Sequence, residues 1–123
     1  MAFFTYPPNE SQNPGFTNVS VTRADIPSAS TINALSSDTS YVKFTGSTAT
    51  TLNGITAGRD GQILMLWNNT GQNMTVTHES ASASAANRIV TATGSNFVTT
   101  GNGSAFFIYD AGLSRWMKLA GNA

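Results

Sequence analysis

Residues 60–78 read DGQILMLWNNTGQNMTVTH, which predicts a strand, a tight turn and a second strand. Side chains alternate along an extended chain, so the first strand is apolar on both faces. One face carries Ile63, Met65 and Trp67, and the other carries Leu64 and Leu66. A two-layer domain usually buries one face of a sheet and leaves the other in water. We therefore expect another copy of the protein, or the surface on which it sits, to cover the second face.

Two later stretches, SAFFIYD at 104–110 and SRWMKLA at 114–120, show the same two-sided pattern. A domain of about 80 residues buries only roughly 60% of its unfolded surface, so it gains much from burying such faces between copies. We infer a homo-oligomer, although strands covered by the N-terminal segment would give the same pattern. The residues assigned to the core or to the oligomer interface are Ile63, Leu64, Met65, Leu66, Trp67, Phe106, Phe107 and Trp116.

From residue 41 onward, short runs with strand composition are separated by turn signals. The expected strands are 41–45, 49–55, 62–68, 73–78, 87–92, 95–100, 104–110 and 114–120. The turn signals are Gly58–Gly61, Asn68–Gly71, Gly101–Gly103 and Asp110–Gly112. Residues 79–87 predict a surface loop, and no internal repeat is evident. This pattern favours an all-β fold, an antiparallel β-sandwich or barrel, for a domain spanning 41–123.

Residues 1–40 hold all four prolines of the chain and predict an extended N-terminal arm. Proline fixes φ and removes a hydrogen-bond donor, so this segment cannot form a helix or a central strand. It is nevertheless too rich in apolar residues for a purely solvated tail. Two arrangements stay open: the arm packs on its own domain, or it crosses to a neighbouring subunit.

The charge and cysteine content narrow the possible partners. The chain has 123 residues with six Lys+Arg, six Asp+Glu and no Cys. Sparse, balanced charge offers no electrostatic attraction for nucleic acid or an anionic membrane, so we expect neither as a partner. Disulfides and thiolate metal sites are excluded. The start MAFFTYPPNESQNPG resembles neither a signal peptide nor an anchor, so we expect folding in a cytosol.

Residues with catalytic chemistry are few. His78 is the only histidine, so a zinc site would need carboxylates for every other ligand. Neither a G-x-S-x-G elbow nor a phosphate-binding glycine loop that opens a helix is present. We therefore predict no enzyme activity, no metal and no cofactor.

Two arginines stand beside large apolar residues, as Arg88-Ile89 and Arg115-Trp116. An arginine in such a place commonly lays its stem on apolar surface and pairs with a turn carboxylate. We expect Arg88 or Arg115 to form a structural ion pair with Asp110 in the last hairpin. Ligand binding by these arginines is the alternative.

Four short patterns occur between residues 52 and 119. They are I-x-x-G-x-x-G at Ile55, Gly58 and Gly61, N-x-(S/T)-G at Asn68 to Gly71, N-R-I at Asn87 to Ile89, and Y-D…R-W at Tyr109, Asp110, Arg115 and Trp116. Together they resemble a β-module of tailed-bacteriophage virions, found in capsid decoration and head-fibre proteins and in tail fibres. The resemblance covers a little over half of the chain and carries no active site.

This resemblance implies a virion-surface protein, usually a homotrimer, with a sandwich or jelly-roll-like knob. The leading hypothesis is a capsid decoration (cement) protein, made in the host cytoplasm, whose trimer binds the major capsid protein. Its arm would dock through Phe3, Phe4, Tyr6, Pro7, Pro8 and Phe16. The alternative is the receptor-binding tip of a tail or head fibre, which would bind a host glycan or protein. A carbohydrate-binding module outside any virus is a third class.

Overall fold

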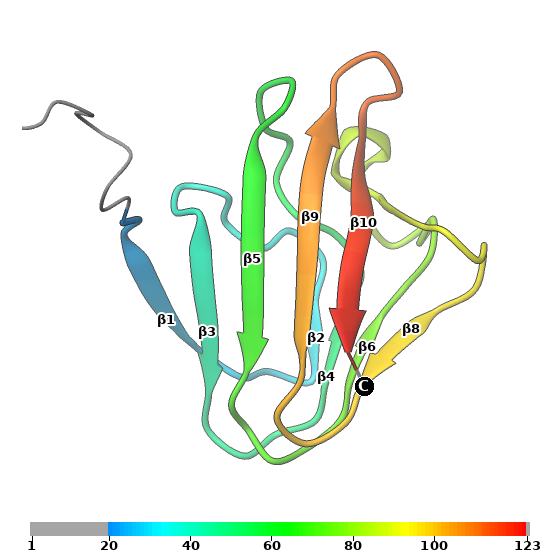
Figure 1. The fold of residues 1–123 in the computed structure, drawn as a ribbon. Coiled ribbons are helices and arrows are strands. Elements are labelled where there is room, and N and C mark those ends of the chain that lie inside the picture. The colour runs from blue at the N-terminus through cyan, green and yellow to red at the C-terminus, as the bar shows by residue number, and fades with distance from the viewer. Residues whose placement is uncertain (1–19, 123) are drawn as a thin grey trace, which may run out of the picture.

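The computed structural model describes residues 20–122, which form two β-sheets (Figure 1). The six-stranded sheet has, in spatial order, β1 (Arg23–Pro27), β3 (Tyr41–Thr45), β5 (Ile63–Asn68), β9 (Ser104–Asp110), β10 (Arg115–Asn122) and β7 (Ile89–Thr91). The four-stranded sheet has β2 (Thr31–Ile32), β4 (Thr50–Leu52), β6 (Met74–Val76) and β8 (Phe97–Thr99). A short 3₁₀ helix, η1, spans Ala85–Asn87. The all-β prediction is confirmed, and so are the strands expected from residue 41 onward.

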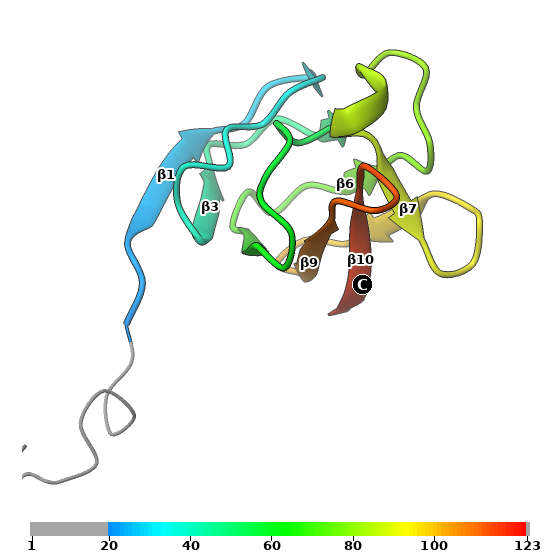
Figure 2. The ribbon, with the colours of Figure 1, turned by 90° about the horizontal axis from the view of Figure 1, so that it is seen from above.

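The chain alternates between the two sheets as it proceeds, so β1 and β2, β3 and β4, and β5 and β6 form successive coils of a solenoid-like stack. Strands of neighbouring coils pair in parallel in both sheets. The last strands close the stack differently, because β9 and β8 pair antiparallel with β5 and β6. In Figure 1, β6 lies behind β9 and β10, and the view from above in Figure 2 separates the two layers. The core side chains lie between them.

The coils of the four-stranded sheet contain an internal repeat. Residues 31–35 read TINAL and residues 51–55 read TLNGI, and Thr31 pairs in register with Thr51. Asn53 Nδ2 donates to Asn33 Oδ1 at 2.8 Å, so the matching asparagines stack on one another. The expectation that the chain has no repeat is therefore wrong. The spacing between coils is unequal, which hides the repeat from a search for a fixed period.

The predicted antiparallel pairing is wrong for the strands of the stacked coils, and a jelly-roll-like arrangement is not confirmed. Turn residues show where the chain changes direction but do not select the next pairing partner. Asn68–Gly71 leads from β5 across to β6 in the other sheet, whereas Asp110–Gly112 does join two adjacent antiparallel strands. A corner between sheets and a hairpin thus use the same turn chemistry.

Residues 20–40 belong to the fold, which differs from the predicted boundary at residue 41. β1 and β2 are edge strands of the two sheets, and Leu35 is buried and bridges Ile55. Sheet edges typically carry charged residues and proline, here Arg23, Asp25 and Pro27. Such residues interrupt the apolar alternation that marks a strand, so short edge strands are hard to find in a sequence. Packing on the chain's own domain therefore holds for this part of the predicted arm. Residues 1–19 lie outside the described residues.

The core lies between the sheets and is built from alternate residues of their strands. Its largest side chain is Trp116, which meets Tyr109 edge to face with ring centroids 5.2 Å apart. The other buried members are Leu35, Val42, Phe44, Leu52, Ile55, Leu64, Leu66, Met74, Val76, Ile89, Ala105 and Phe107. The sequence assigned a set of apolar residues either to the core or to an oligomer interface. The structure places four of them in the core: Leu64, Leu66, Phe107 and Trp116.

Replacing Gly54 with alanine is expected to lower the free energy of unfolding by about 1–3 kcal/mol, because the coils approach closely there. A Cβ at this position would lie 2.5 Å from the carbonyl oxygen of Asn33 and 2.7 Å from the Cβ of Ala83. Urea denaturation measures the change. Gly112→Ala, whose Cβ would meet only the Asp110 side chain, is the control and should change stability by less than about 0.5 kcal/mol. Equal stability of the two variants would contradict this packing.

Candidate functional site

The outward side of the six-stranded sheet is apolar along its central strands. On β5, Leu64 and Leu66 point into the core, while Ile63 is 41% exposed and Met65 and Trp67 are half-buried. β9 repeats the alternation and sets Ile108 opposite Ile63 and Phe106 opposite Met65. β5 therefore carries a second apolar face, and residues 20–122 leave that face partly exposed.

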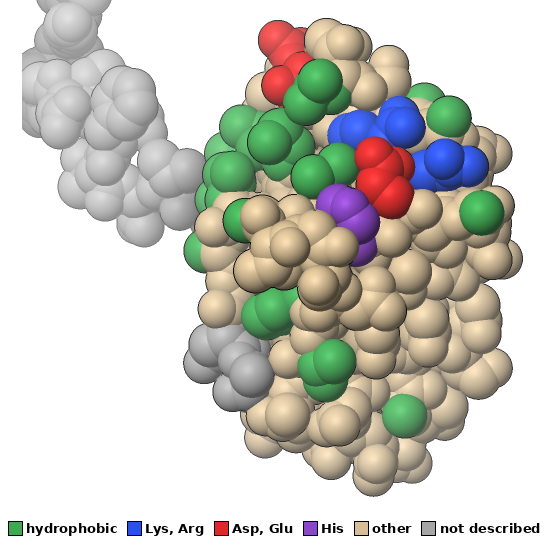
Figure 3. Space-filling model, turned by 90° about the vertical axis from the view of Figure 1, so that its right-hand side faces the viewer, with side chains coloured by type: hydrophobic (Ala, Val, Ile, Leu, Met, Phe, Trp, Pro, Cys, Tyr) green, Lys and Arg blue, Asp and Glu red, His purple; other side chains and the backbone are tan. Residues whose placement is uncertain are grey.

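The neighbouring strands extend this surface. Tyr41 on β3 lies opposite Met65, and Met117 on β10 lies opposite Ile108. We call the combined surface the apolar sheet face; it consists of Tyr41, Ile63, Met65, Trp67, Phe106, Ile108 and Met117. In Figure 3, which is seen from the right-hand side of Figure 1, hydrophobic side chains gather on the left rim, where the six-stranded sheet faces out.

A groove of about 330 Å³ lies on the apolar sheet face and is lined by Tyr41, Met65, Leu66, Trp67 and Ser104. The Trp67 indole is held by a hydrogen bond from its Nε1 to Asn69 Oδ1 at 3.3 Å. None of the lining residues carries a charge, so the groove suits an apolar or aromatic group.

Charged residues of β1 and β3 border this surface on one side, and Asp110 and Arg115 lie at its other end on β9 and β10. Lys43 lies opposite Trp67 on one side and Asp25 on the other, and Asp25 Oδ1 lies 2.8 Å from Arg23 Nε. These residues belong to β1 and β3 at the sheet edge, whereas the outward residues of β5 are uncharged. An apolar centre beside a polar margin is the usual anatomy of a protein–protein interface.

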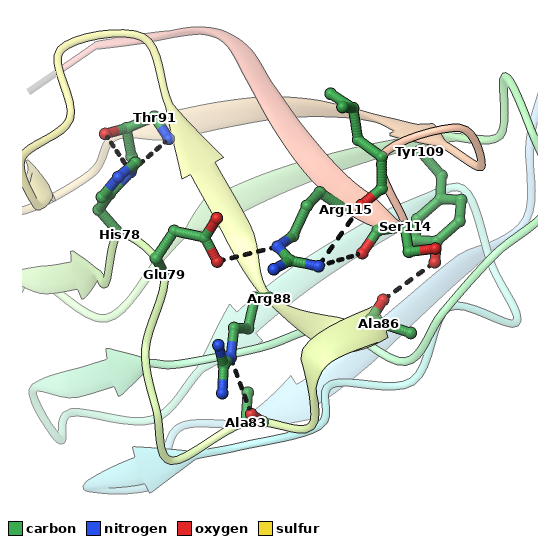
Figure 4. Close-up of polar contacts among 10 residues, drawn as sticks. His78, Glu79, Ala83, Ala86, Arg88, Thr91, Tyr109, Ser114 and Arg115 are labelled. Carbon is green, nitrogen blue, oxygen red and sulfur yellow. Dashed lines mark hydrogen bonds and ion pairs between the residues drawn. The ribbon is translucent and has the colours of Figure 1, made fainter.

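A second cluster joins the loop before η1 to β10 (Figure 4). Arg115 Nε lies 2.8 Å from Glu79 Oε1, with side chains 22% and 37% exposed, and Arg115 also donates to the carbonyl oxygen of Ser114. The Nδ1 atom of His78 accepts a hydrogen bond from the backbone N–H of Thr91 at 3.1 Å. Figure 3 shows the histidine beside acidic and basic side chains. The polar groups of this cluster bond to one another and to the backbone, so the cluster holds the loop before η1 against β7 and β10.

The predicted ion pair with Asp110 is not formed. Asp110 Oδ1 accepts a hydrogen bond from the backbone N–H of Leu113 at 3.0 Å and so stabilises the hairpin turn. Arg88 Nε donates to the carbonyl oxygen of Ala83 at 3.2 Å. Arg115 stands directly opposite Asp110 in the strand register, but its side chain turns to Glu79 instead. The Asp110 carboxylate therefore bonds within its own turn and not to Arg88 or Arg115. The positions of these residues along the sequence do not indicate this choice.

Within residues 20–122, no group of three or more His, Cys, Asp or Glu side chains is arranged to hold a metal ion. In the same range, no helix is long and apolar enough to cross a membrane. The predicted arm residues Phe3, Phe4, Tyr6, Pro7, Pro8 and Phe16 lie outside the described residues. The prediction that they form a docking segment stays a prediction.

Lys118 is expected to make stability depend on pH. It extends from β10 so that its Nζ lies 3.9 Å from the ring centroid of Phe97 on β8, and burial lowers its pKa below the ordinary value of 10.5. Between the lowered pKa and 10.5, the unfolded chain binds more protons than the folded one, so stability rises with pH.

The measurement compares urea denaturation of the wild type and Lys118→Met at neutral pH and near pH 10.5. Methionine keeps a long, flexible apolar stem without the charge. We expect the wild type to gain stability relative to this variant as the pH rises. Identical pH profiles would show that the Lys118 pKa is the same in the folded and unfolded states.

Sequence reasoning found four of the seven residues of the apolar sheet face and missed the other three. Ile63, Met65, Trp67 and Phe106 were assigned to a core or interface set, and the structure places them on the outward side. Tyr41, Ile108 and Met117 were missed because each belongs to a strand whose partner was unknown. The signal available was period-two alternation in 41–45 and 114–120, which assigns a side of the strand but not its neighbours.

Comparison with protein-family models gives no match, and comparison with curated proteins gives no significant match.

Proposed function

We propose that this chain is a structural, non-enzymatic protein of a bacteriophage virion, a capsid decoration protein that acts as a homotrimer on the outer surface of the head. The observation that carries the proposal is the apolar sheet face, which is contiguous and partly exposed, because apolar surface left open on a folded domain often marks a site of protein association. The resemblance of residues 52–119 to virion-surface modules supplies the biological setting.

The fold suits a structural role because its two sheets form a continuous hydrogen-bonded frame. Each coil packs on its neighbours through parallel backbone ladders in two sheets, so the outward side chains are held on a continuous frame. A rigid surface loses little conformational entropy when it binds, which favours tight association.

The proposed mechanism is mass action. A protein that binds the assembled shell but not its separated subunits stabilises the shell. The segment 1–19 would dock on the major capsid protein through its aromatic residues Phe3, Phe4, Tyr6 and Phe16, beside Pro7 and Pro8. Three such segments in one trimer would raise one another's effective concentration and so the overall affinity.

Two measurements test this function. The first is the copy number and position of the protein on purified particles, for which we expect many copies over the head. The second is binding to heads stripped of the protein, for which the full chain with Phe3, Phe4, Tyr6 and Phe16 changed to serine should bind much more weakly. Substitution is preferable to deletion of residues 1–40, because that deletion would remove β1 and β2. A few copies at the tail, or unchanged binding of the variant, would refute capsid decoration.

One observation favours a second function, a receptor-binding fibre tip. Trp67 and Tyr41 line an open groove, and aromatic rings of this kind can stack on a sugar. Purified protein would then block adsorption of phage to host cells, and Trp67→Ala would abolish the block. A decoration protein would give no block in the same assay.

A further inference from the structure

We infer that a second copy of this chain covers the apolar sheet face, with the groove at Tyr41, Met65 and Trp67 near the centre of the contact. The inference rests on the proposed assembly function and names the partner of that same surface. Three features of the described residues select this occupant over others: the size of the face, the distribution of charge and the chemistry of the sheet edge.

The face is too broad for a single strand. It spans β3, β5, β9 and β10, which are adjacent in the sheet. Strands lie about 4.8 Å apart and rise about 3.3 Å per residue, so four strands over six residues give roughly 400 Å² of flat area. A single extended strand would cover a track about one strand wide, whereas a second copy can cover the whole face. A patch of this size is comparable to the largest one on a typical monomer, roughly 300–600 Å², which is often functional.

The charge distribution permits a self-contact. The outward residues of β5 carry no charge. The charged groups stand around them: Arg23, Asp25 and Lys43 on β1 and β3, and Asp110 and Arg115 at the far end of β9 and β10. Two copies can therefore bury their apolar centres without burying an unpaired ion. The formal net charge of the chain is zero, so copies do not repel one another.

The edge of the sheet is a poorer site of association than its face. Within residues 20–122, β1 and β7 are the two edges of the six-stranded sheet. β1 carries the Arg23–Asp25 ion pair and ends at Pro27, while Ile89 on β7 is bridged by His78. Charged residues and proline are the features that prevent edge-to-edge strand pairing. Association therefore falls to the face, where side chains and not backbone groups make the contact.

The test introduces a charge at the centre of the face in the full-length chain. Met65→Lys should weaken association by about 100-fold or more, because the lysine is solvated in the monomer but buried and unpaired in the oligomer. Val98→Lys is the matched control: Val98 is 36% exposed and lies on β8 of the other sheet. Light scattering after size exclusion should give a multiple of 12.9 kDa for the wild type and the control, and 12.9 kDa for Met65→Lys, with unchanged circular dichroism.

A second measurement applies even if Met65→Lys fails to fold. Trp116 is fully buried, so acrylamide quenching of tryptophan fluorescence reports on Trp67. In the wild type, we expect quenching to be weak at high protein concentration and to increase on dilution. A wild-type protein that is monomeric, with Trp67 quenched equally at every concentration, overturns the inference.

Other occupants would give different results. If the full chain with Phe3, Phe4, Tyr6 and Phe16 changed to serine shows Trp67 newly quenched while the wild type is a monomer, the N-terminal segment is the occupant and the inference fails. Protection of Trp67 by a host glycan in a monomeric protein also overturns it. Self-association in solution is measured without virus particles, so an oligomer that is missing from virions refutes the virion role and leaves this interface supported.

Discussion

Trp116→Ala is expected to lower the free energy of unfolding by about 3–5 kcal/mol. The Trp116 side chain is fully buried between the two sheets and meets the Tyr109 ring edge to face at 5.2 Å between centroids. Its Nε1 donates to the carbonyl oxygen of Thr56 at 3.0 Å, which ties β10 to the segment that leads into β5. Truncation would remove the ring contact and this hydrogen bond and would leave a large cavity.

Such a loss is a large part of the 5–15 kcal/mol that stabilises most domains, so the variant should unfold at much lower urea concentration. Leu119→Ala, at a β10 residue that is 55% exposed, is the control and should differ from the wild type by about 0.5 kcal/mol or less. Trp116→Phe should fall between the two because it keeps an aromatic ring but loses the donor. A loss below about 1 kcal/mol for Trp116→Ala would mean that the sheets do not pack around this side chain.

Asn68→Asp is expected to destabilise the protein by about 3 kcal/mol or more at neutral pH. Asn68 ends β5 and is fully buried. Its Nδ2 donates to the carbonyl oxygen of Gln72 at 2.7 Å and to Thr99 Oγ1 at 3.0 Å, while its Oδ1 accepts from Thr70 Oγ1 at 2.7 Å. A carboxylate can reproduce only the acceptor, so two donors to oxygen would be replaced by a buried negative charge facing the Gln72 carbonyl.

The pH dependence distinguishes this cause from simple loss of packing. Burial favours the neutral acid, so the introduced carboxyl has a raised pKa in the folded state and the folded protein binds more protons than the unfolded chain. The stability of Asn68→Asp therefore falls as the pH rises from the unfolded-state pKa of this carboxyl to its raised folded-state pKa. The loss of stability relative to the wild type is smallest in acid. Asn69→Asp is the control, because Asn69 is exposed and its oxygen still accepts from Trp67 Nε1. A deficit that does not change with pH would contradict the buried-charge explanation.

Local pattern predicted much of the fold because strand formation from residue 41 onward follows from alternation and turn chemistry. The run 41–45 became β3 and the run 104–110 became β9 with the expected bounds. β1 and β2 were not predicted, because RADIP and TI carry too little apolar alternation to stand out from a polar arm. Those strands form only because β3 and β4 offer them a ladder of backbone partners.

The candidate site was only half predictable for a related reason. The two-sided character of 63–67 is visible in the sequence, but which side faces the core depends on where the second sheet lies. Leu64 and Leu66 face it, and Met65 and Trp67 do not. Two carboxylates lie near Arg115 in the folded chain, those of Asp110 and Glu79. Its ion-pair partner is Glu79, which is distant in sequence.

The sequence by itself determined an all-β chain, the positions of its main strands and turns, and a strand with apolar residues on both faces. Only the tertiary structure decided that β1, β3 and β5 pair in parallel as stacked coils, and that Trp116 is buried while Trp67 lines an outward groove. The physical reason is that alternation and turn geometry are local, whereas burial is non-directional and parallel and antiparallel ladders both satisfy the backbone. The choice among them depends on contacts between residues far apart in the chain.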